Sequence, residues 1–141
     1  MPPVADCELP TTEDLVGAHV SAIRDQASAL CRLPRGWDLG DAAAISTEVA
    51  ATAVRVAARI TCPECLPPVL SPTIAGHVLL DWTWGADHIE IEVSADGRLE
   101  VLVGTDGVQH EFETTIDNDL HLHWIAWQVT AIGVDRFNAP S

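Results

Sequence analysis

The sequence contains no lysine, so its seven basic residues are all arginine. Against them stand 21 Asp and Glu residues, which gives a formal net charge of −14 at pH 7. Schiff-base and P-loop chemistry both require a lysine amine, so the composition excludes both. Direct binding to a phosphate backbone requires a basic stripe that releases counterions, and this chain has too little basic charge to build one. We therefore expect no direct nucleic-acid partner.

Long apolar runs are also missing. No stretch of the sequence approaches the roughly 20 apolar residues needed to cross a bilayer. The first ten residues, MPPVADCELP, have neither the basic nor the apolar region of a secretory signal peptide. We therefore expect a cytoplasmic protein with no membrane partner. The 141 residues, 48% of them hydrophobic, suit a single domain over residues 11–135, with a flexible arm at 1–10 and a tail at 136–141.

Three segments have the periodicity of helices. Apolar residues recur every three or four positions between Thr12 and Pro34, and again from Asp41 or Ser46 to Ile60. Near the C-terminus, DNDLHLHWIAWQVTAIGV opens with residues that cap a helix and is apolar around most of its circumference. Residues 61–73, TCPECLPPVLSPT, contain four prolines and should run extended across the surface.

Four segments alternate with period two, as strands do: residues 77–84, 87–93, 97–103 and 108–115. The pairs Asp96–Gly97 and Asp106–Gly107 favour tight hairpins with positive φ at both turn positions. The sequence thus predicts an α+β fold, with two N-terminal helices, a four-stranded antiparallel meander, and a C-terminal helix packed on one sheet face.

Alternation in these strands separates apolar from acidic side chains. Ile89, Ile91 and Val93 point to one face of the sheet, and the intervening glutamates point to the other. The glutamates expected on this second face are Glu90, Glu92, Glu100, Glu111 and Glu113. Antiparallel sheets commonly leave one face in water, so this face is either ordinary solvated surface or an acidic docking surface.

The motif CPEC places Cys62 and Cys65 at the spacing of half a zinc site or of a redox pair. A structural zinc needs two more ligands, and none of the candidates has one of the common paired spacings. These candidates are Cys7, Cys31, His121 and His123. The two histidines also point about 200° apart on a helix. We expect unpaired thiols, no metal and no cofactor; the alternative is a zinc-binding module or metal-dependent enzyme that uses Cys62, Cys65 and nearby histidines.

A second polar group lies in the strands. His77 and Asp81 share one face of a strand, and His88 would lie across from them. This set could form a metal or acid–base site, but no nucleophile or third ligand accompanies it. A polar patch at the wet edge of the sheet is the simpler interpretation.

The loop LPRGWDLGDAAAIS places Trp37 and Asp38 between glycines. We expect Trp37 to fold back and cover the junction of the first two helices with the sheet, because a buried indole removes a large apolar area from water. Asp38 should accept hydrogen bonds from N–H groups of the turn or the following helix. In the alternative, Trp37 is partly exposed beside Arg35 and contacts a partner.

Four stretches carry a resemblance: GWDLGDA, PPVLSPT, GHVLLDW and IEIEV, all within residues 30–103. They resemble many small uncharacterised bacterial and phage proteins that carry GWDGxGA, a helix, a P-x-v-x-P-T segment, a Gly-started strand ending near L-x-W, and an I-x-I strand. Leu39 stands where that pattern usually has Gly, and Asp41 intrudes before Ala42. The CPEC motif is not part of the pattern. The resemblance implies a fold and no activity.

The charge and the glutamate-bearing strands predict a non-enzymatic, acidic interaction protein that binds a basic surface of a partner. Antitoxins, immunity-type inhibitors and small regulators are of this kind, and mimicry of nucleic acid in phage defence is a close variant. The C-terminal helix has more apolar surface than one sheet face can cover. We therefore also expect a homodimer, or a partner docked along Trp124 and Trp127.

Overall fold

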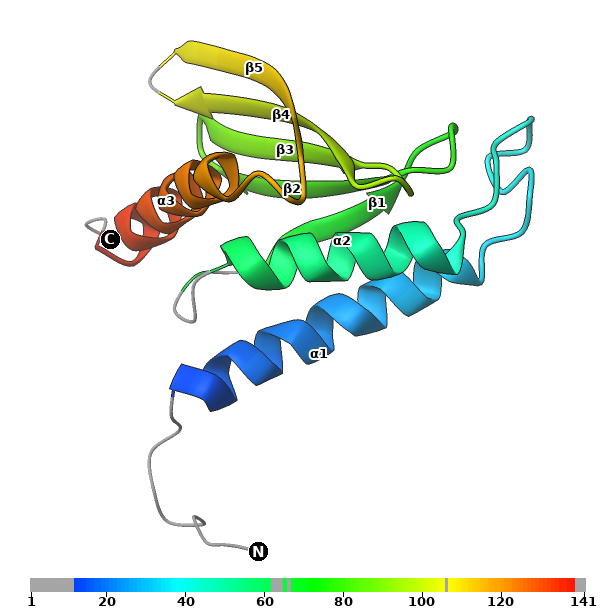
Figure 1. The fold of residues 1–141 in the computed structure, drawn as a ribbon, viewed down its shortest axis with the longest axis horizontal. Helices are drawn as coiled ribbons and strands as arrows, with labels where there is room; N and C mark the ends of the chain where they lie inside the picture. Colours follow the sequence, from blue (N-terminus) through cyan, green and yellow to red (C-terminus); the bar gives the residue numbers. More distant parts are fainter. Residues whose placement is uncertain (1–11, 62–64, 66, 106, 139–141) are drawn as a thin grey trace, which may run out of the picture.

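A computed structural model describes residues 12–61, 65, 67–105 and 107–138, and side-chain surroundings are described only between residues 20 and 132. The described residues form three helices and a five-stranded antiparallel sheet (Figure 1), which confirms the α+β class. Within this part of the chain, no helix is both long and apolar enough to cross a membrane. The expected N-terminal arm lies outside the described residues.

The two N-terminal helices form where the periodicity predicts them. Helix α1 spans Thr12–Cys31, and its described apolar face is buried. Helix α2 spans Thr47–Ile60 and begins after Ser46, whose Oγ accepts a hydrogen bond from the Val49 N–H at 3.2 Å. This cap satisfies one of the N–H groups that the first turn leaves unpaired, which fixes the start of α2 at the later of the two expected positions.

The sheet has one strand more than the sequence predicted. Its strands lie in chain order and are β1 (Val69–Pro72), β2 (Val78–Trp84), β3 (Asp87–Val93), β4 (Arg98–Thr105) and β5 (Val108–Thr115). Strand β1 comes from the proline-rich segment that was expected to run extended across the surface and was not counted as a strand, so the four-strand prediction was wrong.

Strand β1 forms because Leu70 has a place in the core. Leu70 pairs with Leu80 of β2 and is buried, and its N–H donates to Oε1 of Gln26 on α1 at 3.0 Å. Pro72, which ends this short strand, is tolerated because β1 lies at the edge of the sheet.

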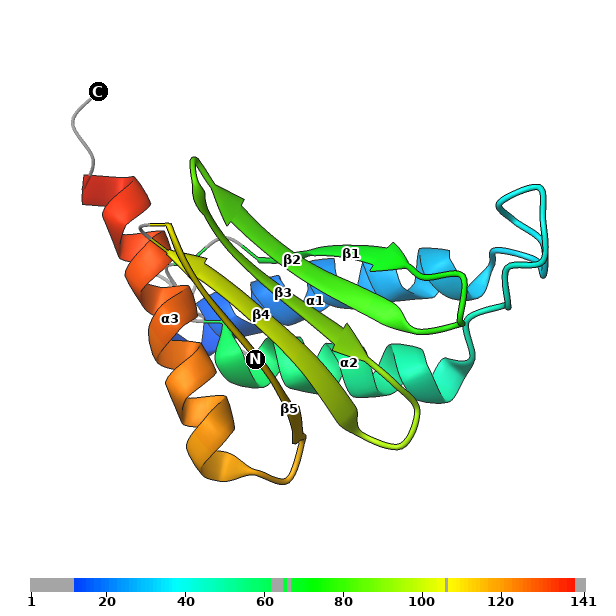
Figure 2. The same ribbon diagram turned by 90° about the horizontal axis from the view of Figure 1, so that it is seen from above.

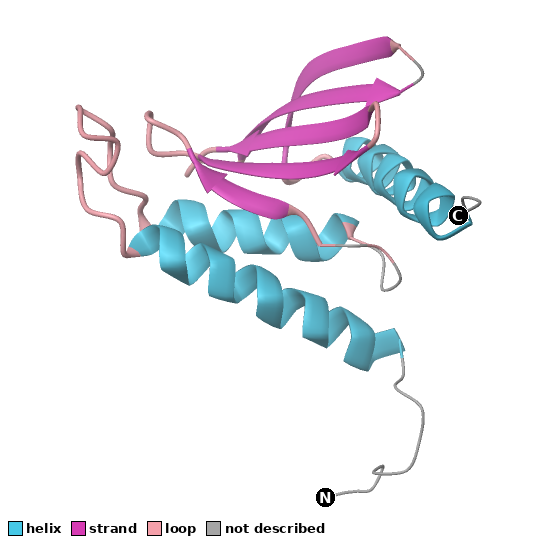
Figure 3. Ribbon diagram, turned by 180° about the vertical axis from the view of Figure 1, so that it is seen from behind, coloured by secondary structure: helices cyan, strands magenta, loops and turns pink. Residues whose placement is uncertain are grey.

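The helices all lie on one side of the sheet. Helices α2 and α3 (Asp119–Asn138) pack against it, and α1 lies beneath α2 and beside β1 (Figures 1 and 3). The core fills the space between α2, α3 and the inner face of the sheet. Figure 2 looks onto the opposite face of the sheet, with α1 and α2 behind the strands and α3 to the side, next to β5. Helix α3 continues past residue 135, where the expected domain ended.

The turn between β3 and β4 differs from the expected two-residue hairpin. Gly97 has φ of 82°, but Leu39 is the sole described non-glycine residue with positive φ, so Asp96 has negative φ. The Gly97 N–H donates to the Ser94 carbonyl at 3.1 Å, and the Ser94 N–H donates to the Arg98 carbonyl at 3.1 Å. The connection is therefore a type I turn followed by a left-handed glycine.

Candidate functional site: the acidic face of the sheet

The outer face of the sheet carries the five glutamates that the alternation placed there. Glu90 and Glu92 come from β3, Glu100 from β4, and Glu111 and Glu113 from β5. The neighbouring side chains Ile89, Ile91, Val93, Leu99, Val101 and Val103 are buried on the inner face. We call the surface formed by the five glutamates, together with Leu79 and Leu102, the acidic face.

Strand register brings these residues into two rows that cross the sheet. The first row contains Leu79, Glu92, Glu100 and Glu113. The second contains Asp81, Glu90, Leu102 and Glu111. Residues directly opposite on antiparallel strands have Cβ atoms about 4.5–5.5 Å apart, so like charges in a row repel. The first row thus holds three adjoining carboxylates.

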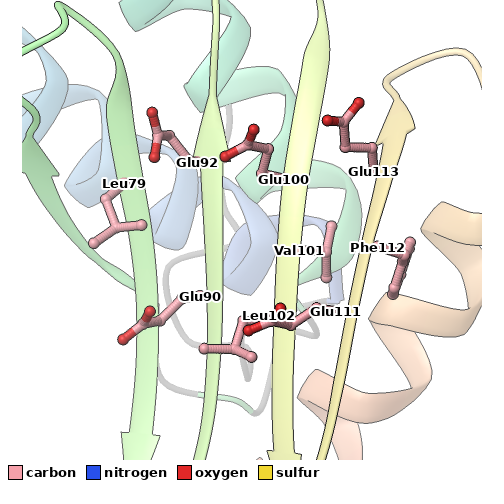
Figure 4. A pocket seen from close by; sticks show the side chains of 9 residues that line it. All are labelled: Leu79, Glu90, Glu92, Glu100, Val101, Leu102, Glu111, Phe112 and Glu113. Carbon is pink, nitrogen blue, oxygen red and sulfur yellow. The ribbon is translucent and has the colours of Figure 1, made fainter.

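The acidic face is hollowed. A depression of about 470 Å³ is lined by the five glutamates and by Leu79 and Leu102 (Figure 4). Neither leucine is among the site residues predicted from the sequence. Alternation along β2 puts Leu79 on the outer face, but only the register with β3 shows that it lies beside Glu92. The depression therefore combines carboxylates with apolar side chains, which suits the charged tip and aliphatic stem of lysine or arginine.

A histidine and an arginine, His77 and Arg98, lie at one end of the acidic face. His77 Nδ1 is 2.7 Å from Glu92 Oε2, and Nδ1 donates this hydrogen bond because a carboxylate only accepts. Arg98 lies two residues before Glu100, on the same side of β4, and it lines a second depression of about 370 Å³ together with His77. Both side chains lie beside Glu92 and Glu100 of the first row.

The expected patch of His77, Asp81 and His88 is not assembled as predicted. Asp81 lies opposite Glu90, and His88 lies opposite Thr83. The His88 ring covers Gly104 so closely that a Cβ there would come within 2.5 Å of it. The partner of His77 is Glu92, which the sequence analysis assigned to the acidic face alone.

The loop between α1 and α2 is held by its own hydrogen bonds. The Trp37 indole N–H donates to the Ala43 carbonyl at 3.2 Å, and Asp38 Oδ1 accepts from the N–H groups of Gly40 at 2.9 Å and Ala42 at 3.2 Å. The expected role of Asp38 is confirmed. Trp37 is half-buried and is not among the side chains packed on the core, so its predicted position over the helix–sheet junction was wrong.

This loop lies beside the β1–β2 turn, at the end of the molecule away from α3 (Figure 3). The Ala43 N–H donates to the Ile74 carbonyl at 2.9 Å, and a Cβ at Gly76 would come within 3.2 Å of Ala43 Cβ. Arg35 is exposed in the same loop. The structure therefore places Trp37 and Arg35 apart from the acidic face, and the two regions do not form one site.

Helix α3 leaves aromatic side chains uncovered. Trp127 is 69% exposed and Trp124 is 36% exposed, while Leu122, Ile125 and Val129 are buried. The Trp124 ring meets that of Phe112 edge-on at 5.6 Å between centroids, and that of His110 at 6.1 Å. Since His110 and Phe112 lie on β5, the exposed aromatic surface of α3 continues onto the edge of the sheet.

The CPEC motif falls only partly within the described residues, because Cys62 lies outside them. Cys65 is buried and disulfide-bonded, so the expectation of unpaired thiols was wrong for this residue. Metals bind the thiolate form of cysteine, which a disulfide sulfur does not supply. Among the described residues, no group of three or more His, Cys, Asp or Glu is arranged to hold a metal ion.

No protein-family model, curated protein sequence or solved structure matches the chain. The resemblance to the small GWDGxGA proteins stays a prediction. What the chain does is therefore argued from the geometry of the acidic face and of α3.

Proposed function

We propose that the chain is a non-enzymatic interaction protein whose acidic face binds a basic surface of a partner protein. The observation that carries the proposal is the first row, in which Glu92, Glu100 and Glu113 adjoin across three strands. Adjoining carboxylates destabilise a sheet by about 0.2–1 kcal/mol per opposed pair. A bound basic partner would relieve this repulsion.

The shape of the acidic face supports the same partner chemistry. The depression is lined by half-buried Leu79 and Leu102 as well as by carboxylates. Lysine and arginine bury their aliphatic stems on apolar surface while their charged groups meet carboxylates. Antitoxins, immunity-type inhibitors and small regulators are proteins of this kind. Mimicry of nucleic acid is a special case, in which duplex DNA would compete with this chain for the partner.

The test uses the partner captured by affinity from the cells that make this protein. Replacing Glu92, Glu100 and Glu111 together by Gln should slow association and flatten its dependence on salt, because electrostatic steering is screened over about 8–10 Å at ordinary ionic strength. Folding should be intact, since these side chains are not part of the core. An unchanged association rate and salt slope would show that the face is only solvated surface.

A matched control separates position from net charge. Asp25, Asp41 and Asp117 are exposed and lie outside the acidic face, on α1 and in two loops. Replacing these three residues by Asn removes the same charge as the glutamine variant. The control should associate at close to the wild-type rate. Equal slowing in both variants would mean that overall charge, and not the acidic face, attracts the partner.

A further inference from the structure

The strand at one edge of the sheet, β5, lacks most of the features that usually protect such edges. The opposite edge, β1, has four residues and ends in Pro72, whereas β5 has eight residues and contains neither proline nor lysine. Its register with β4 is continuous from Val108 to Thr115, without a bulge. Natural edge strands avoid further pairing by short length, proline, bulges and charged side chains. Of these, β5 has only the charged side chains of its glutamates, which repel an acidic strand and attract a basic one.

The backbone groups that β5 turns outward can be identified from one hydrogen bond. The Ile116 N–H donates to the Gly97 carbonyl at 2.9 Å, next to the paired residues Arg98 and Thr115. In an antiparallel pair, bonding to the neighbour alternates along each strand. The even-numbered residues of β5 therefore bond to β4. Gln109, Glu111 and Glu113 direct their N–H and C=O groups away from β4, toward the open edge.

The two sides of this edge differ in chemistry. On the outer side, the Glu111 and Glu113 side chains belong to the acidic face. On the inner side, Phe112 and His110 contact Trp124 of α3, which remains 36% exposed. A strand added here would thus place alternate side chains against carboxylates and the intervening ones against an aromatic surface.

We propose that β5 accepts an extended segment of a partner protein as an antiparallel sixth strand, in which Lys or Arg alternates with apolar residues. The proposal rests on the proposed function, because it gives the basic partner a mode of binding. Residues directly opposite one another across a sheet share a face, so the basic side chains lie opposite Glu111 and Glu113. Main-chain hydrogen bonds supply affinity in this mode, and the alternate side chains supply specificity.

A second copy of this chain fits the edge less well. Antiparallel pairing of two β5 strands about a twofold axis would place Glu111 and Glu113 of both copies on the same face. The acidic rows of the two sheets would then continue into each other and repel. The homodimer expected from α3 is therefore an outcome that the test must distinguish from peptide addition.

The test uses a blocked eight-residue peptide in which Lys and Val alternate, bound to the full chain at low salt. In the proposed arrangement, the lysine residues lie opposite Gln109, Glu111 and Glu113, so their N–H groups bond to β5 and those of the valines face away. A peptide methylated on the lysine amides should bind about tenfold more weakly, or worse, than its matched control methylated on the valine amides.

Amide hydrogen exchange gives an independent readout. Binding of the alternating peptide should slow exchange at the N–H groups of Gln109, Glu111 and Glu113. Strand addition would be overturned if both methylated peptides bound with the same affinity and hydrogen exchange at these three amides were not slowed. The acidic face would then bind the peptide by electrostatic attraction alone.

Two other outcomes would overturn strand addition. Failure of the alternating peptide to bind would do so, while the proposed function would still be judged by the glutamine variant and the captured partner. A dimer in sedimentation that protects the same three amides without peptide would assign the edge to a second copy.

Discussion

Glu92 and Glu100 lie directly opposite each other on β3 and β4, with their carboxylates on the same face of the sheet. Glu113 adjoins Glu100 on the other side, so Glu100 is opposed by two carboxylates and Glu113 by one. Repulsion between these carboxylates destabilises the pairing of β3 with β4, so packing on the inner face of the sheet must stabilise it. Leu99 and Val101 provide this packing, since both are buried and flank Glu100 on β4.

Replacing Glu100 by Gln should therefore stabilise the fold. Removing two opposed pairs should raise the free energy of unfolding by about 0.5–1 kcal/mol, and Glu113→Gln should give roughly half of this. Urea denaturation at low ionic strength measures both, and the gains should shrink as salt screens the carboxylates. Equal effects of the two substitutions would contradict the arrangement of the row.

Leu39 is strained. It has φ of 67° and is fully exposed, so it adopts a left-handed conformation with no burial to offset the cost. Leu39→Gly should stabilise the chain by about 0.5–1 kcal/mol, because glycine has no Cβ to clash in this region. Leu39→Ala is the control, since it removes the exposed side chain and retains the strain; it should leave the melting temperature nearly unchanged.

The hydrogen bond from the Trp37 indole N–H to the Ala43 carbonyl stabilises the loop between α1 and α2. Trp37→Phe should lower the free energy of unfolding by about 0.5–1.5 kcal/mol, the usual net worth of one hydrogen bond. Trp127→Phe is the matched control at an exposed position and should change stability by less than about 0.5 kcal/mol. If the two variants unfold at the same denaturant concentration, the Trp37 hydrogen bond contributes little.

Much of this structure could be predicted from the periodicity of the sequence. Other features of the sheet could not, because they depend on contacts between residues that are distant in sequence. Alternation identified the inner and outer faces of β3 and β4 because it depends on neighbouring residues alone. Strand β1 was missed because Leu70 is held by Gln26 and Leu80, which no local pattern links to it. The same holds for Leu79, whose place beside Glu92 depends on register.

Errors in the loop had a different cause. Trp37 was expected to cover the helix–sheet junction, but it is half-buried and its indole N–H donates to the Ala43 carbonyl, six residues away in the same loop. The sequence supplies the donor and does not say which carbonyl accepts. In the same way, Asp96–Gly97 predicted a hairpin correctly, although the chain used a longer turn in which only the glycine is left-handed.

A chelator should not change the melting temperature. Among the described residues, no three or more His, Cys, Asp or Glu side chains are arranged to bind a metal ion, and Cys65 is disulfide-bonded. Differential scanning fluorimetry with and without EDTA measures this, and elemental analysis of the purified protein is the control. A fall of several degrees with chelator, together with stoichiometric zinc, would instead establish a structural metal site.

The pH dependence of the β3–β4 turn should be visible at Asp96. The Ser94 hydroxyl donates a hydrogen bond to this carboxylate at 2.7 Å and, with the Arg98 N–H at 3.2 Å, holds the pKa of Asp96 below its ordinary value of 3.8. A carboxylate whose pKa is lowered by folding stabilises the folded state above its unfolded pKa, and that stability is lost as the pH falls through the folded pKa.

We therefore expect wild type to be more stable than Asp96→Ala at neutral pH, and the difference to shrink as the pH falls below 3.8. The difference between the two proteins is compared because the effect of acid on the rest of the chain is common to both and cancels. Asp96→Asn is the control: it keeps an acceptor oxygen in the turn but does not titrate, so its stability relative to Asp96→Ala should not vary with pH. Urea denaturation of the three proteins at matched pH values measures these differences. A wild-type advantage over Asp96→Ala that stays constant down to the lowest pH at which both fold would contradict the assignment.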